Sequence, residues 1–487
     1  NIRHPLTSSK NESTDNVAGM ATDAAGNTYV MQNLYYDYTS SPDPSVSISG
    51  HTGTSYTPSA DHGCVIIDKV SPTGVVTHYA YISIANSSGS SVTGTSIKLS
   101  PAGKLYVAGY FEGTVTFLTP SGFNTYQTAS GGGYDAFLCS FDMTSNRIDV
   151  FNRQGGTGSE YPTDITFNGT DVYISGHYRA ENSTSESTVF NTNPSGSLVL
   201  VTATAHTSLG VSNSFILRFN TSALTCTAAY GWVTLDNSYS SFIPKGLLVL
   251  GSTANQTYIT GSYVGNVTLS TGITLTNPSS SYTRMFVWKR GSSPAAFQEG
   301  VNLSWPNAGG MSSGNALYSE GSHIMVAGTI TQNSSTTGHY GDADAVVIRY
   351  AVNFSSITEQ WRVYMGGNGN DMATSIVNNG GDYVIGGYST GAGAGWEFPH
   401  SIGNTSTDPI VNVSTTASPE MGFVASYTAA GKVNWVKSAQ ANNIKVTAVS
   451  SNQKCYTSFG GYLSTNTTWD EGTVMGTSSP ANNRLFF

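Results

Sequence analysis

The chain has 487 residues, of which 10% are charged, against about 25% in an ordinary globular protein. The formal net charge is −9 at pH 7 and Lys and Arg are scattered singly, which argues against nucleic acid as a partner. No apolar run approaches the roughly 18 residues that a membrane-spanning helix needs, so no membrane span is expected.

A strand pattern recurs seven times along the chain. An aromatic-rich strand is followed, after a loop of variable length, by a second apolar strand and in six copies by a third. The copies open in turn at Tyr29, Tyr106, Tyr173, Tyr258, Met325, Tyr383 and Tyr456. Repeats spaced roughly 60 to 85 residues apart suit the four-stranded blades of a β-propeller. Stretches with helical periodicity are nearly absent, so helix should be scarce.

We therefore predict an all-β fold, a single seven-bladed β-propeller of four-stranded blades that forms one domain over residues 1–487. A Gly recurs near the end of the aromatic-rich strand, as in KLYVAGYF and DVYISGHY, where neighbouring backbone must come close. The blades are expected at residues 15–84, 85–156, 157–235, 236–305, 306–367, 368–439, and 440–487 together with 2–6.

The last blade is one strand short, because the seventh copy stops at Phe487. An unpaired sheet edge exposes a row of backbone donors and acceptors. We expect the N-terminal segment 2–6 to complete this blade, since Pro5 is acceptable on an outer edge strand. The alternative is a strand from a neighbouring subunit, which would link copies of the chain into a homopolymer.

The start of the chain and its cysteines bear on location. The chain begins at Asn1 rather than Met, as a mature form does after removal of a secretion signal, so an extracellular or cell-surface location is expected. Cys64, Cys139, Cys226 and Cys455 allow three disulfide pairings, and buried thiols between blades are the alternative. No CxxC pair occurs, so a cysteine metal site is not expected.

Asn-x-Ser/Thr sequons are the most frequent chemical motif, and they predict N-linked glycans. Each one falls in a predicted turn or loop, or directly after a strand. The alternative is that Asn and Ser favour turns whether or not they carry sugar. The candidate sites are Asn11, Asn86, Asn168, Asn182, Asn220, Asn255, Asn266, Asn302, Asn333, Asn353, Asn404, Asn412 and Asn466.

The predicted topology sorts these sites between two faces. Connections from the second to the third strand of a blade share a face with the crossovers between blades, and they are long, as from Arg179 to Asn213. This elaborated face should carry Asn86, Asn182, Asn266, Asn302, Asn333, Asn404, Asn412 and Asn466. The plainer face should carry Asn168, Asn220, Asn255 and Asn353. Long loops on a rigid scaffold are where function usually lies.

The repeat resembles the bacterial-type β-propeller repeats known as SBBP repeats. The closest matches are TDAAGNTYV at residues 22–30, GGYDAF at 132–137 and GDADAV at 341–346. The resemblance covers nearly the whole chain and implies a seven-bladed propeller of a secreted or surface protein. Its motifs are structural rather than catalytic. The long Ser/Thr-rich loops and the sequons depart from that pattern.

No catalytic constellation is predicted. A glycosidase needs two carboxylates flanking the scissile bond, and the available acids form no recognisable set: Glu112, Asp135, Asp342, Asp344, Glu397, Asp470 and Glu471. Asp135 and Asp344 occupy the same place in their repeats, which favours capping of a turn. The stretch TTWDEGT around Trp469 does not match the sialidase box.

No metal or cofactor is predicted either. The histidines are dispersed, and His4, His51, His62 and His78 form no HExxH pair. Two Asx-rich loops, HYGDADA with Asp342 and Asp344, and GGNGNDM with Asn368, Asn370 and Asp371, do not match the EF-hand pattern and are better explained by turn chemistry.

Two functions fit these observations. The first is a non-catalytic, glycosylated structural protein that builds an extracellular filament, sheath or surface layer, alone or with other matrix components. The second is a carbohydrate-binding or carbohydrate-active propeller that uses its long-loop face. For the second, the possible stacking platforms are Trp232, Trp288, Trp305, Trp361, Trp396 and Trp469, of which Trp396 and Trp469 lie in long loops.

Overall fold

The computed structural model describes residues 16–36, 62–84, 90–119, 122–129, 132–145, 147–180, 188–191, 198–199, 211–232, 241–250, 256–268, 274–277, 282–290, 297–302, 311–331, 343–352, 357–367, 369–390, 396–399, 411–413, 420–440, 444–452, 457–463, 467–468, 474–475 and 484–486. These residues form 37 strands and no helix, so the predicted all-β class is confirmed. None of the described segments could therefore cross a membrane as a helix.

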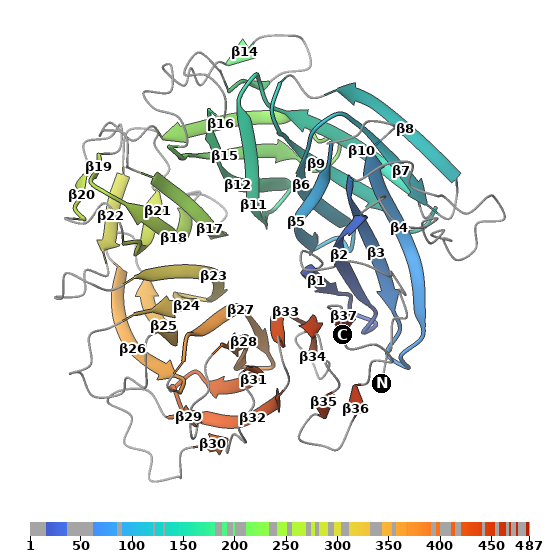
Figure 1. The fold of residues 1–487 in the computed structure, drawn as a ribbon. Coiled ribbons are helices and arrows are strands. Elements are labelled where there is room, and N and C mark those ends of the chain that lie inside the picture. Colours follow the sequence, from blue (N-terminus) through green and yellow to red (C-terminus); the bar gives the residue numbers. More distant parts are fainter. Residues whose placement is uncertain are drawn as a thin grey trace.

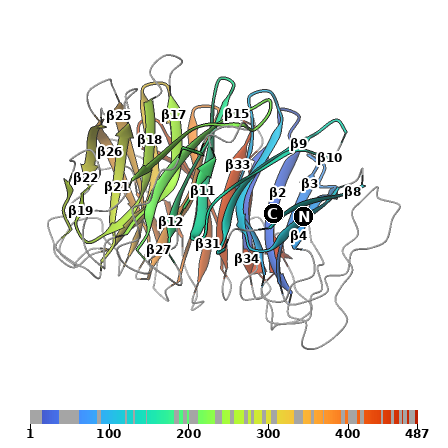
Figure 2. The same ribbon diagram turned by 90° about the horizontal axis from the view of Figure 1, so that it is seen from above.

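The chain is a β-propeller, as predicted. Six sheets of four or more strands and a seventh sheet of three described strands stand around a common axis (Figure 1). In each sheet the first strand in sequence lies nearest the axis and the later strands follow outward. Seen from the side, the sheets stand next to one another as upright layers (Figure 2). We number them blades 1 to 7 in chain order.

The blade strands have the following bounds. Blade 1 contains β1 (Asn16–Thr22), β2 (Thr28–Tyr36), β3 (His62–Val70) and β4 (Val76–Ile84). Blade 2 contains β5 (Val92–Leu99), β6 (Leu105–Phe111), β9 (Asp135–Asp142) and β10 (Arg147–Gln154). Blade 3 contains β11 (Ser159–Asn168), β12 (Asp171–Arg179), β15 (Asn213–Asn220) and β16 (Cys226–Trp232). Blade 4 contains β17 (Ser241–Leu250), β18 (Gln256–Val264), β21 (Arg284–Arg290) and β22 (Phe297–Asn302).

The remaining blades follow the same order. Blade 5 contains β23 (Ser312–Glu320), β24 (His323–Ile330), β25 (Asp344–Val352) and β26 (Ile357–Met365). Blade 6 contains β27 (Asp371–Asn379), β28 (Asp382–Ser389), β31 (Met421–Thr428) and β32 (Val433–Gln440). Blade 7 contains β33 (Lys445–Ser451), β34 (Thr457–Leu463) and β37 (Arg484–Phe486). The segment 2–6, predicted to complete blade 7, lies outside the described residues.

Within the described residues, five of the connections from the second to the third strand contain a further two-stranded hairpin. The hairpins are β7–β8 (Thr114–Thr119, Gly122–Ala129), β13–β14 (Phe190–Asn191, Leu198–Val199), β19–β20 (Val267–Thr268, Thr274–Leu275), β29–β30 (Trp396–Phe398, Val411–Val413) and β35–β36 (Thr467–Thr468, Val474–Met475). The first of them belongs to blade 2 but pairs through β7 with β4, so the sheet of blade 1 has six strands. These connections therefore elaborate one face of the ring.

Every first strand carries a β-bulge at the same place. The extra residues are Ala18, Thr95, Thr163, Lys245, Asn315, Thr374 and Thr447. A bulge bends its strand and increases the local twist. It also explains the recurring Gly of the second strand: a Cβ at Gly176, Gly261 or Gly328 would collide with a carbonyl oxygen of the first strand just before the bulge. The predicted close backbone approach is thus confirmed at these positions.

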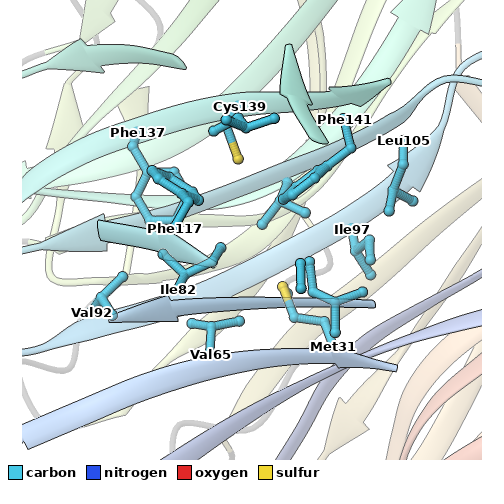
Figure 3. Packing of buried hydrophobic residues seen from close by; sticks show 14 of the residues in the cluster. Met31, Val65, Ile82, Val92, Ile97, Leu105, Phe117, Phe137, Cys139 and Phe141 are labelled. Atoms are coloured by element: carbon cyan, nitrogen blue, oxygen red, sulfur yellow. The ribbon is translucent and has the colours of Figure 1, made fainter. Parts of the chain in front are cut away.

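The core is divided among the seven junctions between neighbouring blades. Each junction holds one cluster of buried apolar side chains. Between blades 1 and 2, Met31 and Val65 pack against Ile97, Phe137 and other side chains of the next blade (Figure 3). Burial of such faces is the main favourable term in folding, so the blades stabilise one another and no blade is an independent unit.

The ring closes between blades 7 and 1. Thr447 Oγ1 donates a hydrogen bond of 2.7 Å to the carbonyl oxygen of Val17, across 430 residues of sequence. Val17 and Val30 pack there against Ala448. The first and last described parts of the chain are therefore neighbours in space.

Candidate functional site

Five of the predicted glycosylation sites lie within the described residues. Asn168 and Asn220 end β11 and β15, and both stand at turns on the plainer face. Asn266 precedes β19 and is exposed, Asn302 ends β22, and Asn412 lies in β30. The other candidates, Asn11, Asn86, Asn182, Asn255, Asn333, Asn353, Asn404 and Asn466, lie outside the described residues.

The turn at Asn220 shows what a sequon does structurally. Asn220 Oδ1 accepts hydrogen bonds from the amide of Ser222 at 2.8 Å and from its hydroxyl at 2.5 Å, which makes an Asx turn. Leu224 follows at a φ of 48°, held there by complete burial in the junction of blades 2 and 3. The shape of this turn is set by packing and side-chain hydrogen bonds, and its tip at Ser222 is exposed.

Two pairs of acidic side chains meet between blades on the elaborated face. Asp135 begins the third strand of blade 2, and Glu160 lies at the start of the first strand of blade 3. Asp344 and Asp371 occupy the matching places in blades 5 and 6. All four side chains are buried, at 0 to 1% exposure. We call these sets the first and the second carboxyl pair.

The first carboxyl pair is covered by the end of β10 and by the segment that crosses from blade 2 to blade 3. Asp135 forms an ion pair with Arg153 of β10, with Nε 2.8 Å from Oδ2. Glu160 accepts a hydrogen bond of 2.5 Å from Thr188 Oγ1 and a longer one of 3.4 Å from the amide of Gly156. A Cβ at Gly155 would collide with a carboxylate oxygen of both acids, so a Gly is required there.

The second carboxyl pair repeats this geometry with one change. The amide of Gly367 donates a hydrogen bond of 2.9 Å to Asp371 Oδ2. A Cβ at Gly366 would lie 2.8 Å from Asp344 Oδ1 and nearer still to Asp371 Oδ2. Tyr364 stands where Arg153 stands in the first pair, two residues before the Gly-Gly step. The second pair therefore lacks the matching arginine.

These pairs bear on two sequence-based interpretations. Asp135, expected to cap a turn, is buried and forms an ion pair with Arg153 of the neighbouring strand. The two Asx-rich loops, for which turn chemistry is predicted, lie together: Ala343 forms a parallel bridge with Asn370, and the amide of Asp371 donates to the carbonyl of Ala343 at 2.7 Å. Among the described residues, no group of three or more His, Cys, Asp or Glu side chains is arranged to hold a metal ion.

A second polar feature, missed by the sequence analysis, is a ring of hydrogen bonds near the axis. At six junctions a side chain at or beside a bulge binds the neighbouring blade, and at the junction of blades 1 and 2 the side chain of Asn33 from β2 does so. The bonds join Asn33 to Gly94, Ser96 to Asp164, Asp164 to Leu247, Lys245 to Ser313 and Asn315, Asn315 to Ala373, Thr374 to Val446, and Thr447 to Val17. Aligning the strand before each aromatic-rich strand would have shown the recurring polar residue.

Charged groups in this ring serve packing. Lys245 Nζ donates to Ser313 Oγ at 2.8 Å and to Asn315 Oδ1 at 3.2 Å, and burial lowers the pKa of its ammonium group. Asp164 accepts from Ser96 Oγ at 3.1 Å and from the amide of Leu247 at 3.0 Å. Asp164 thus joins blades 2, 3 and 4, and Lys245 joins blades 4 and 5.

The tryptophans proposed as sugar platforms are mostly packed inside. Trp288, Trp361 and Trp396 are 2%, 8% and 1% exposed. The prediction for Trp396 is wrong: it lies in β29, where the hairpin folds onto the junction of blades 5 and 6 and buries the ring against Phe423. The side chains of Trp232, Trp305 and Trp469 are outside the described residues. Trp435, on the outer strand β32, is 37% exposed.

The described cysteines are buried. Cys64 and Cys139 lie on the third strands of blades 1 and 2 and Cys226 on the outer strand of blade 3. Cys139 and Cys226 are free thiols, which favours the interpretation that they fill blade junctions. Burial raises the pKa of Cys226 to about 12 and also raises that of Cys139, so neither is a ready nucleophile. Cys455 is outside the described residues.

No family model and no curated protein matches the chain. Among solved structures, the chain is similar to a sucrose-6-phosphate hydrolase from Lactobacillus gasseri, with 9% identity, a TM-score of 0.28, and coverage of 96% of this chain and 88% of that one. A likeness this distant says nothing about activity.

Proposed function

We propose that this propeller is a non-catalytic structural glycoprotein of the extracellular space, a subunit of a filament, sheath or surface layer. The observation that carries the proposal is the burial of the described side chains that could bind or hydrolyse a sugar. The described candidate tryptophans are 8% exposed or less, and the carboxyl pairs are at most 1% exposed. A sugar-binding or hydrolytic site needs such groups to converge on an open surface, whereas here they hold blades together.

The outer edge of blade 7 supports assembly through a strand. Within the described residues β37 pairs with β34 on one side only, while the six other blades have a fourth strand or more. The chain already uses strand addition elsewhere, because β7 of one blade pairs with β4 of another. An open edge accepts an extended segment readily. Such a segment from a neighbouring copy would join rings in a homopolymer.

Glycans fit this role at the turns. The tips at Asn220 and Asn266 project from the sheets on opposite faces, and N-linked sugar there would leave the blade edges available for contact between copies. The proposal therefore expects glycans on both faces and self-association through the rims.

The test is electron microscopy of the native material together with its mass before and after enzymatic removal of N-glycans. The proposal expects ordered fibres or sheets whose repeat is one ring, and a mass loss corresponding to several glycans. Dispersed single rings that bind a saccharide on a glycan array would instead support the carbohydrate-binding alternative. An unchanged mass would remove the glycoprotein part of the proposal.

A further inference from the structure

Four of the blade junctions share one backbone hydrogen bond, which makes their side chains directly comparable. In each, an amide at the start of a first strand donates to the carbonyl just before the third strand of the preceding blade. The bonds run from Glu160 to Tyr134 at 2.7 Å, from Phe242 to Ser212 at 2.9 Å, from Ser312 to Thr283 at 2.9 Å and from Asp371 to Ala343 at 2.7 Å. The residues at the matching positions of these junctions are Asp135 and Glu160, Asn213 and Phe242, Arg284 and Ser312, and Asp344 and Asp371.

Only two of these four junctions combine two acids, and both are closed to water. The four carboxyl groups are at most 1% exposed, and in each pair one oxygen of either acid lies beside the same glycine, Gly155 or Gly366. Two like charges this close in a low-dielectric interior repel strongly, and one of the two groups then keeps its proton. The Asn213 and Arg284 junctions have no such pair.

We propose that each carboxyl pair holds one proton between its two acids, and that losing this proton in alkaline solution loosens the ring at these two junctions. The junctions bound the arc formed by blades 3, 4 and 5. Release of both would therefore separate this arc from the one formed by blades 6, 7, 1 and 2. This proposal does not depend on the proposed structural role.

In the first carboxyl pair the proton belongs to Glu160. Arg153 from β10 stabilises the ionised form of Asp135, while Thr188 and the buried phenol of Tyr178 from β12 are the neighbours of Glu160. Burial is the main cause that raises the pKa of Glu160 to about 8. The charge of Asp135 also raises it, while the hydrogen bonds from Thr188 and Gly156 and the charge of Arg153 oppose the rise.

In the second carboxyl pair an uncharged side chain, that of Tyr364, takes the position of Arg153. Asp371 faces Asp344 from β25, Ser389 from β28 and the amide of Gly367. Tyr364 from β26 is neutral, and its hydroxyl accepts a hydrogen bond of 3.1 Å from Arg362, which is itself bound to Glu359. Burial is the main cause that raises the pKa of Asp371 to about 8, with a further contribution from Asp344.

The sign of the pH effect follows from these directions. Both acids have a higher pKa in the folded chain than in the unfolded chain, so their contribution to stability is complete below about pH 4 and is lost as the pH rises toward 8. The junctions should be tightest in acid.

Hydrogen exchange of the wild-type chain tests this directly. The amides of Glu160 and Asp371 are compared with those of Phe242 and Ser312, which make the same hydrogen bond without an acid pair. After correction for intrinsic rates, all four should be similarly protected at pH 5. At pH 9 the first two should lose protection relative to the others by at least about tenfold, the factor that one pKa unit represents. A ratio that stays constant from pH 5 to pH 9 would overturn the proposal.

Two substitutions locate the proton. Glu160→Gln and Asp371→Asn keep the shape of the protonated acids but cannot ionise, so the double variant should show a pH-independent ratio. Asp142→Asn, at a half-buried turn acid outside these junctions, is the control and should behave like the wild type. If the double variant does not fold, the ratio of amide protection between the two kinds of junction in the wild-type chain still tests the proposal. Recovery of protection at pH 9 on adding Ca²⁺ would overturn the proton assignment in favour of a cation.

Discussion

Side chains are of two kinds: those that the geometry of the repeat requires, and those that occur at some junctions and distinguish them from the others. Gly176, Gly261 and Gly328 belong to the first kind, because a Cβ there would strike the backbone of a bulged strand. Asp135, Glu160, Asp344 and Asp371 belong to the second, because two of the four comparable junctions carry them and the other two do not. Trp396 shows how misleading a position within a long connection can be, since its ring is 1% exposed.

Trp396→Ala should destabilise the fold by about 3–5 kcal/mol, because it empties a large volume at the junction of blades 5 and 6. Trp435→Ala is the matched control: at 37% exposure it should change stability by less than about 0.5 kcal/mol. Denaturant unfolding of both variants measures the difference. Equal stabilities, with saccharide binding lost only in Trp396→Ala, would contradict the packing role.

His78 should add a separate pH dependence in blade 1. Its Nδ1 lies 2.6 Å from Oδ1 of the buried Asp68, and this hydrogen bond, opposed by burial, raises the pKa of His78. The stabilisation is complete below about pH 6.5 and is lost as the pH rises through the raised value. His78→Gln should therefore cost about 1.5–3 kcal/mol at pH 5.5 and much less at pH 9. Thermal melts at both pH values measure it; an equal cost at the two would disprove the coupling.

Single strands and hairpins show how connections cover the blades. The β7–β8 hairpin lies on the outer edge of blade 1, although its sequence belongs to blade 2. The β29–β30 hairpin reaches the end of β26, where the amide of Gly366 donates to the carbonyl of Glu397 at 3.2 Å. Both cover the outer part of the preceding blade, so the elaborated face protects edges that would otherwise be exposed.

Replacing residues 114–129 by a short Gly-Ser linker should uncover the edge of β4. Tyr81 to Ile84, which pair with Leu118 to Val115, should lose protection from hydrogen exchange. The uncovered edge should also promote association between molecules. Exchange mass spectrometry and light scattering measure the two effects. The same replacement of residues 269–273, in the corresponding connection of blade 4, is the control. Unchanged protection of β4 would show that the hairpin is dispensable.

The molecule as a whole is a closed set of junctions. Each blade is joined to the next by a cluster of apolar side chains and by a polar bond near the axis, and the last junction joins Thr447 to Val17. Because every blade needs both neighbours, unfolding should be cooperative around the ring, and a weak junction should affect blades far away in sequence.

Deleting residues 1–6 tests how blade 7 is completed. If this segment supplies the fourth strand within its own ring, the deletion should lower the melting temperature of the isolated subunit, because β37 is left as an open edge. Deleting Asn1 alone is the control. If the melting temperature is unchanged and only assembly is lost, the strand is exchanged between neighbouring copies. Calorimetry and microscopy of the same samples separate the two cases.

Much of the architecture could be predicted from local pattern. Alternating apolar strands, turn residues and a seven-fold recurrence of aromatic-rich strands predict an all-β propeller, since strand periodicity and turn chemistry are local properties. The recurring Gly in KLYVAGYF and DVYISGHY likewise indicates a close backbone contact before the contact partner is known.

The sites depend on contacts that no local pattern encodes. Asp344 and Asp371 are separated by a whole outer strand, and Thr447 and Val17 by 430 residues, yet each pair meets because the blades close into a ring. Burial at those contacts turns ordinary acids into proton-holding pairs and a loop tryptophan into core. Local residue preferences set the strands and turns; the packing of one blade on the next decided which side chains are buried, which are paired and which face solvent.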